Sequence, residues 1–209
     1  MDGDFAPLDE LAALAREYDA RIIVDEAHST GVFGQTGRGL SEALNEASAI
    51  TVHTCGKALG VAGALVCGSA STIDFLVNKA RPFIYSTAPP PMLAACLIRA
   101  LELIDEEPEY RQILLDRVRF THEKLRAITD SALANSGSQI IPVILQEEER
   151  ALKIASELQS LGFDVRAIRP PTVPQGTSRL RISINALHSE GDIAELCTAL
   201  GRAMEKFTR

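Results

Sequence analysis

The sequence predicts an α/β protein of two units, residues 1–112 and residues 113–209. Short apolar runs alternate with longer segments in which apolar residues recur at helical spacing, a pattern typical of sheets covered by helices. In the first unit the apolar runs lead into charged or glycine-rich residues, as buried strands of a parallel sheet do. Three strands are few for a free-standing parallel sheet, so this unit is expected to be the end of a larger doubly wound domain.

In the first unit, leucine and alanine recur at helical spacing over residues 6–20, which predicts a helix. The run "RIIVDEAH" over residues 21–28 is apolar and then charged, so we expect a buried strand with Asp25 at its C-terminal edge. Two further buried strands are expected in "AITVHTCG" (49–56) and "GALVCG" (63–68).

A long helical pattern extends from Pro91 to about Ala127 and is broken near Pro108, because proline disrupts a helix interior. The second unit then predicts the order strand, helix, strand, strand, helix, over residues 139–146, 147–162, 164–170, 179–185 and 189–207. The first of these helices should bury one face, and the last should begin with a capping box. The expected inward residues are Ala151, Ile154, Ala155 and Leu158, and the expected capping residues are Ser189 and Asp192.

Composition excludes several classes of protein. The formal net charge of −7 argues against general nucleic-acid binding, which depends on basic side chains that contact phosphates. No apolar run reaches the roughly 18 residues of a membrane helix, and the acidic segment "MDGDFAPLDELAAL" lacks the basic start of a secretory signal. The cysteines show neither CxxC pairing nor metal-like spacing with histidine, so we expect no metal site. They predict reduced thiols, mostly in the core, of a cytoplasmic protein: Cys55, Cys67, Cys96 and Cys197.

Chemically versatile residues follow two of the predicted strands. Asp25 and His28 lie just past the end of one strand, and Lys57 lies just past the next, where open α/β sheets bind their ligands. Taken singly, the aspartate could cap a turn, the histidine could be structural, and the lysine could be a surface residue in a glycine loop. Together they are the groups that pyridoxal 5′-phosphate (PLP) chemistry needs. A lysine amine forms the Schiff base, and a carboxylate keeps the pyridine nitrogen protonated so that the ring accepts electrons.

Small and hydroxyl residues around the lysine favour the same interpretation. Gly56 and Gly60 allow the backbone to pass close to a bulky ring and phosphate, and Thr54 can offer its hydroxyl to that phosphate. The run "GVFGQTGRG" (31–39) matches neither glycine-rich nucleotide-binding pattern, so we expect a mobile loop near the site. The remaining candidates, His53 and His122, are expected to be structural.

Several segments together resemble one enzyme family. They are "MDGDFAPL", "VDEAHSTGVFGQTGRG", "TCGKALG", "YSTAPPP" and "RPPTVPQGTSRLRISINALH", and they cover nearly all of the chain. In this order they are similar to the α-oxoamine synthases, which are fold-type I PLP enzymes. The resemblance implies the C-terminal part of a PLP-dependent transferase (aspartate aminotransferase-like) large domain, followed by a small C-terminal α/β domain.

The resemblance also implies a role for each cofactor-binding residue. Lys57 would hold PLP and later move the α-proton of the substrate, and Asp25 would pair with the pyridine nitrogen. His28 would hydrogen-bond the phenolic oxygen of the ring, and Thr54 would bind the phosphate. Thr87, in "YSTAPPP", would reach the phosphate of a partner subunit, because sites in this family lie at the interface of a homodimer.

A substrate carboxylate would be bound by an arginine of the segment "RLRIS". The resemblance favours Arg181, whose guanidinium would form a bidentate contact. Arg179 is the competing choice, since alternation along a strand places both side chains on the same face.

The segment "AIRPPTVPQGTSRLR" (167–181) is most similar to the version of the family that condenses L-alanine with pimeloyl-CoA, or pimeloyl-ACP. That reaction releases CO2 and gives 8-amino-7-oxononanoate in biotin biosynthesis. The alternatives are another α-oxoamine synthase that uses glycine, a class II aminotransferase, or an inactive fragment. The last arises because "MDGDFAPL" is an internal segment in the family. About half of the family's chain, including a glycine-rich loop and a histidine that stacks on PLP, is expected to precede it.

Overall fold

The computed structural model describes residues 1–44, 49–129, 133 and 136–208. The chain forms two compact units, one of residues Ala6–Arg111 and one of Met1–Phe5 together with Gln112–Arg209. This division differs from the predicted one, 1–112 and 113–209, because the first five residues lie with the C-terminal unit. Among the described helices, none is both long and apolar enough to cross a bilayer.

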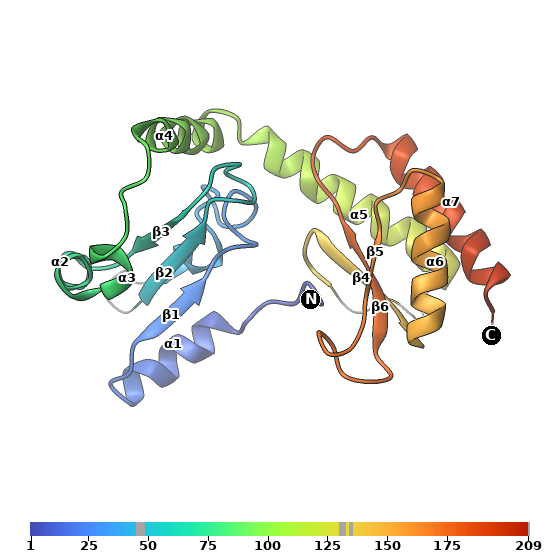
Figure 1. Ribbon diagram of the computed structural model, residues 1–209, viewed down its shortest axis with the longest axis horizontal. Coiled ribbons are helices and arrows are strands. Elements are labelled where there is room, and N and C mark those ends of the chain that lie inside the picture. The colour runs from blue at the N-terminus through green and yellow to red at the C-terminus, as the bar shows by residue number, and fades with distance from the viewer. Residues whose placement is uncertain (45–48, 130–132, 134–135, 209) are drawn as a thin grey trace. The chain divides into compact units, whose positions relative to one another are not determined.

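The unit Ala6–Arg111 contains a three-stranded sheet in the order β1-β2-β3 (Figure 1). Its strands are β1 (Ile22–Asp25), β2 (Ala49–Thr54) and β3 (Ala64–Cys67). The first two are parallel, as expected, whereas β3 runs antiparallel to β2. The expectation of a purely parallel sheet is therefore wrong at β3, because the connection 55–63 is too short for the crossover that parallel strands require.

Helices α1 (Leu8–Glu17) and α4 (Pro91–Glu106) lie within the predicted helical segments, and α5 (Glu109–Thr129) begins just after the predicted break. Three further elements were not predicted: the 3₁₀ helix η1 (Leu40–Ala43), α2 (Ala70–Lys79) and α3 (Arg81–Ile84). A signal for α2 is present in the sequence, since Ser69 caps it by accepting a hydrogen bond from the Thr72 amide.

The strands of this unit were predicted to be buried, but Val24 is the single buried residue among the described residues of these strands. Ile23 is 69% exposed and Val66 is 45% exposed, and large apolar side chains are also exposed along α2, α3 and α4. Side chains of a sheet are buried only where another layer covers that face, and the exposure of Ile23 and Val66 shows that the described residues leave their positions uncovered. The predicted thiol burial holds for Cys55 but is wrong for Cys67 and Cys96, which are exposed.

The C-terminal unit has an antiparallel sheet in the order β4-β6-β5. Its elements are β4 (Ile140–Gln146), α6 (Glu148–Ser160), β5 (Arg166–Ile168), β6 (Ser178–Ser183) and α7 (Glu190–Lys206), all within the predicted segments. In Figure 1, α6 lies alongside the sheet, and it contacts all three strands. The core is fully buried and includes Leu125, Ile141, Leu158, Leu180 and Leu200.

Two local predictions for this unit are confirmed. All four residues expected to face inward on α6 are buried, and α7 begins with a capping box in which Ser189 and Asp192 bond each other's backbone. The unit thus has the dense apolar core that a separately folding domain requires.

Candidate active site

The C-terminal ends of β1 and β2 lie at the same edge of the sheet, because the two strands are parallel neighbours. Asp25 ends β1 and Thr54 ends β2, and the ladder continues past Asp25 through a 2.8 Å hydrogen bond from the Glu26 amide to the Val52 carbonyl. The next residues along the chain carry the other candidates, His28 after β1 and Lys57 after β2. The structure therefore brings these four predicted residues to one edge.

The loop after β2 holds Lys57 outward on an apolar base. The Cys55 amide donates to the Gly63 carbonyl at 2.9 Å, and the Val61 amide donates to the Cys55 carbonyl at 2.9 Å. Cys55, Leu59 and Val61 are buried against residues of α4, whereas Lys57 is exposed. The run around the lysine is nearly free of charge because its apolar residues form this base. In the part of the chain that the structure describes, the Lys57 amine forms no ion pair or hydrogen bond.

The environment of Thr54 fits a phosphate group. Its Oγ1 is buried and has no hydrogen-bond partner among the described residues, a situation that costs about 1–3 kcal/mol when it is left uncompensated. The glycines of the adjoining loop leave open space, since a β-carbon added at Gly56, Gly60 or Gly63 would meet no atom within 4 Å. An unpaired hydroxyl beside an open glycine backbone is a suitable place for a phosphate, so the residues present fit PLP.

The side chains of Asp25 and His28 are both exposed. The aspartate accepts a 2.9 Å hydrogen bond from the Ala27 amide, which orients its carboxylate at the strand end. His28 lies in the turn that follows. Thr87 lies in the exposed connection between α3 and α4. Their assigned roles remain predictions.

In the C-terminal unit, the two candidate arginines of β6 have different environments. The Arg179 side chain is only 7% exposed, and its Nη1 donates to the carboxylate of Asp2 while its Nε donates to the Thr177 carbonyl at 2.9 Å. Burial lowers the pKa of Arg179. By contrast, Arg181 Nε is buried and lacks a hydrogen-bond partner within the described residues. Arg179 is thus already engaged, whereas Arg181 retains an unused donor.

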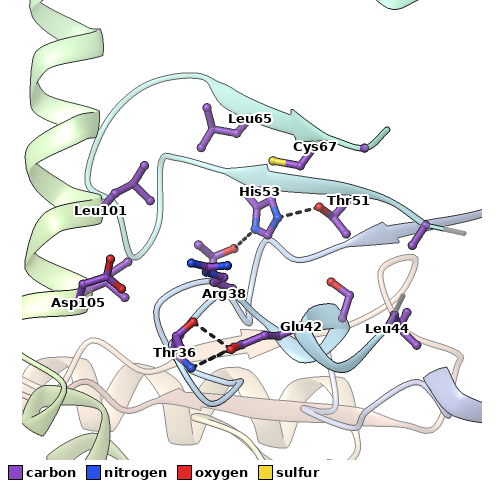
Figure 2. Close-up of a pocket in the computed structure, with 16 residues that line it drawn as sticks. Thr36, Arg38, Glu42, Leu44, Thr51, His53, Leu65, Cys67, Leu101 and Asp105 are labelled. Atoms are coloured by element: carbon purple, nitrogen blue, oxygen red, sulfur yellow. Dashed lines mark hydrogen bonds between the residues drawn. The ribbon is translucent and has the colours of Figure 1, made fainter. Parts of the chain in front are cut away.

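A cavity of about 530 Å³ lies on the side of β2 and β3 where Thr51, His53 and Leu65 project (Figure 2). Thr54 belongs to the alternate set of β2 side chains, and neither it nor Lys57 is among the described residues that line the cavity. The candidate cofactor residues and this cavity are therefore separate features of the unit.

The imidazole of His53 connects the sheet to the neighbouring turn. Its Nδ1 lies 2.8 Å from Thr30 Oγ1, and its Nε2 lies 2.9 Å from Thr51 Oγ1. Because the Thr30 hydroxyl donates to the Glu26 carbonyl, it accepts from His53, which assigns the proton to Nδ1. Both ring nitrogens are then satisfied, in agreement with the structural role that the sequence suggested.

Comparison with known proteins places the chain in a family. A family model for aminotransferase class I and II matches residues 1–200. The chain belongs to the aminotransferase class I and II family. The resemblance stated from the motifs is confirmed at the level of relatives as well, since curated 8-amino-7-oxononanoate synthases match nearly the whole chain.

Two of these relatives show the extent of the match. The 8-amino-7-oxononanoate synthase of Anaeromyxobacter dehalogenans (strain 2CP-C) is 44% identical over 206 residues, which are 98% of this chain and 52% of the relative. That of Cupriavidus necator (strain H16) is 45% identical over 211 residues, with the same coverage of each chain. The chain spans about half the length of the curated relatives it matches.

Solved structures confirm the predicted fold class. A serine palmitoyltransferase of Sphingomonas wittichii superposes with a TM-score of 0.92 at 31% identity, and covers 99% of this chain and 52% of its own. A serine palmitoyltransferase structure that contains PLP gives 0.92 at 32% identity, with the same coverage. The 8-amino-7-oxononanoate synthase of Francisella tularensis gives 0.84 at 27% identity, and covers 100% of this chain and 61% of its own.

One residue that the sequence reasoning did not single out is prominent at the same edge. Glu26 follows Asp25 directly, yet it is among the most buried side chains of the described residues. Its signal in the sequence is the second acid of "DEAH", which alternation places on the opposite side of the extended backbone from Asp25.

Proposed function

We propose that this chain is the C-terminal part of a PLP-dependent acyltransferase. The complete enzyme would condense L-alanine with pimeloyl-CoA, or pimeloyl-ACP, and release CO2 to give 8-amino-7-oxononanoate in biotin biosynthesis. The single observation that carries the cofactor assignment is the buried, unpaired Thr54 hydroxyl beside the open glycine loop of Lys57. The relatives support this reaction, because curated 8-amino-7-oxononanoate synthases are 44–45% identical over 98% of this chain.

When bound, PLP supplies an electron sink beside the α-carbon of the amino acid. In our proposal, Thr54 binds the phosphate, and the Lys57 amine holds the cofactor and takes the α-proton at Nζ. The Asp25 carboxylate keeps a proton on the pyridine nitrogen, and His28 hydrogen-bonds the phenolic oxygen. The exposure of Lys57, with no ion pair among the described residues, leaves its amine available for this work.

The remaining proposed contacts concern the substrate and a partner subunit. Arg181 binds the carboxylate of the amino acid, which its unused Nε donor supports. Thr87 contacts the phosphate held by a second copy of the chain, so the complete enzyme is a homodimer. The enzyme acts in the cytoplasm, where its acyl thioester substrate would be available.

Covalent trapping tests the cofactor assignment on the chain itself. The chain is incubated with PLP and reduced with borohydride, and the pyridoxyl group is located by peptide mass spectrometry. We expect the modification on Lys57 and its loss in Lys57→Ala. The matched control is Lys79→Ala, since Lys79 is another exposed lysine of the same unit. Equal labelling in Lys57→Ala and the wild type would exclude Lys57 as the attachment point.

A further inference from the structure

The carboxylate of Glu26 is buried and holds the loop that follows β1. The residue is 1% exposed. Its Oε1 accepts a 2.6 Å hydrogen bond from the Ser41 amide, and its Oε2 accepts a 3.1 Å hydrogen bond from the Leu40 amide. The Ser29 hydroxyl also donates to Oε2. One carboxylate therefore connects both ends of the segment 29–41.

The backbone of Glu26 holds the turn that carries His28. Its carbonyl accepts from the Ser29 amide at 3.1 Å and from the Thr30 amide at 3.0 Å, and the Thr30 hydroxyl donates to it at 2.7 Å. The Glu26 amide is bonded to β2 through the Val52 carbonyl. His28 thus sits in a turn that is closed by hydrogen bonds from Ser29 and Thr30 to the Glu26 carbonyl.

The loop passes so close to the carboxylate that only glycine fits at one point. Gly39 has φ +112°, and a β-carbon there would lie 2.6 Å from the Glu26 carboxyl carbon. This close approach lets the Leu40 and Ser41 amides, at the start of η1, reach the carboxylate. The contact between the Glu26 carboxylate and the start of η1 therefore depends on both Glu26 and Gly39.

The bound donors are neutral, and no ion pair to Glu26 occurs in the described part of the chain. Burial by itself raises the pKa of Glu26, but the hydrogen bonds from Ser29, Ser41 and Leu40 outweigh burial and hold the pKa below its usual value. At neutral pH the group is an anion held by hydrogen bonds.

We propose that Glu26 is a positioning residue for the cofactor site: by bonding Ser29, Leu40 and Ser41, its carboxylate fixes the turn that presents His28 beside Asp25. The inference rests on the proposed function, because it assigns Glu26 a role toward the group that His28 would contact. Glu26 itself faces away from Asp25 and acts through the turn.

Hydrogen exchange on the chain without cofactor tests whether the Glu26 carboxylate fixes the loop. In Glu26→Gln an NH₂ donor replaces one of the two carboxylate oxygens, and each oxygen accepts from a different backbone amide, so one of these amides would face a donor in place of its acceptor. We expect the Leu40 and Ser41 amides to exchange at least about tenfold faster than in the wild type. Glu42→Gln is the control, since Glu42 bonds Thr36 in the same loop. It should leave the Leu40 and Ser41 amides within about twofold of the wild type.

A spectroscopic readout tests whether the turn positions His28 for the cofactor. The wild type, Glu26→Gln and Glu42→Gln are each fused behind the N-terminal half of the Cupriavidus necator relative. PLP is added to the three proteins, and the visible absorption of the lysine-bound cofactor is titrated with pH. We expect PLP to be trapped on Lys57 in all three. The titration midpoint should move by at least about 0.5 pH units in Glu26→Gln only, because a loosened His28 changes the hydrogen bond to the phenolic oxygen. Glu26→Asp retains a carboxylate, so its titration midpoint should lie closer to that of the wild type than the midpoint of Glu26→Gln does.

The outcomes separate the inference from the proposed function. If the wild-type fusion takes up no PLP at Lys57, the proposed function is overturned and the role of Glu26 toward the cofactor falls with it. If PLP binds but the midpoint or the amide exchange is the same in Glu26→Gln and the wild type, only the inference about Glu26 is overturned. Should Glu26→Gln fail to fold, Ser29→Ala removes one donor to the same carboxylate and should shift both readouts in the same direction.

Discussion

The guanidinium of Arg179 is paired with the carboxylate of Asp2, 177 residues earlier in the chain. Arg179 is almost fully buried, whereas the Asp2 side chain is 46% exposed. The segment that carries Asp2 is seated closely, since a β-carbon at Gly3 would lie 2.2 Å from the Ile140 carbonyl oxygen. The first five residues therefore contribute a counterion to the core of the C-terminal unit.

Replacing this counterion should destabilise the C-terminal unit. In Asp2→Ala the Arg179 charge stays buried without its partner, and we expect a loss of about 1–3 kcal/mol in the free energy of unfolding. Urea denaturation, followed by a probe in the C-terminal unit, measures the change. Asp4→Ala is the matched control, since Asp4 is an exposed aspartate of the same segment, and its midpoint should stay close to that of the wild type. Equal midpoints for the two variants would contradict the role of Asp2.

The two arginines of β6 should respond differently to a conservative change. For this measurement the chain is fused behind the N-terminal half of the Cupriavidus necator relative, to give a full-length enzyme. Arg181→Lys should raise the KM for alanine at least about tenfold and leave that for pimeloyl-CoA nearly unchanged, because an ammonium cannot reproduce a two-pronged contact. Arg179→Lys should mainly lower stability. The opposite pattern in the alanine KM would show that Arg179 is the carboxylate ligand.

Asp25→Asn separates turnover from cofactor retention. In the same full-length enzyme we expect kcat to fall at least about 100-fold, since the neutral amide cannot keep the pyridine nitrogen protonated. PLP content should stay near one per chain, because Thr54 and Lys57 retain their contacts. Absorbance of released PLP and a ketone assay measure the two quantities. Near-normal turnover in Asp25→Asn would refute the role of this carboxylate.

The stability of the unit Ala6–Arg111 should depend on acid through Glu26. The folded-state pKa of Glu26 lies below its usual value of 4.5. A group with a depressed folded pKa contributes stability that is present above the unfolded pKa and is lost as pH falls through the folded pKa. We expect the unfolding free energy of this unit to be level near neutral pH and to decline below about pH 4.5. Glu26→Gln should be less stable at neutral pH and should decline less steeply. Parallel pH curves for the two proteins would rule out this contribution.

The two units should differ in hydrogen-exchange protection. The core of the C-terminal unit includes Ile141, Leu180 and Leu200, all fully buried, so amides of β4 and β6 should be strongly protected. The strands β1–β3 have exposed apolar residues such as Ile23 and Val66, so they should exchange faster and the chain should aggregate. We also expect no synthase activity from the chain by itself. Strong protection over residues 20–68, in a monodisperse sample that forms ketone, would contradict this expectation.

Local periodicity and capping chemistry were sufficient to predict most elements. The inward face of α6 and the Ser189 cap of α7 follow from side-chain spacing within one turn or two, and both are found. The direction of β3 follows from the length of the loop before it, a cue that the apolar run "GALVCG" does not contain. The exposure of Ile23 was not visible in the sequence, because an apolar run shows that a residue could be buried and not what covers it.

For the site, the rule that ligands bind at the C-terminal ends of parallel strands was sufficient to place Asp25 and Thr54 at the same edge of the sheet. It could not separate Arg179 from Arg181, since both occupy the same face of β6 and the partner that distinguishes them, Asp2, is remote in sequence. Glu26 was missed for a related reason. Its donors at Leu40 and Ser41 are backbone amides, which leave no trace in residue identity.

Residues 1–5 lie in the same unit as residues 112–209, so the unit Ala6–Arg111 interrupts the sequence of the C-terminal unit. Two covalent connections join the units, at Phe5–Ala6 and at Arg111–Gln112. A single proteolytic cut at the second connection would leave a C-terminal piece that still binds the N-terminal end through Asp2 and Arg179. A fragment expressed from residue 112 onward would lack Asp2, and the buried Arg179 guanidinium would need a substitute anion from the solvent. Chloride or sulfate should therefore stabilise such a fragment more than they stabilise the intact chain.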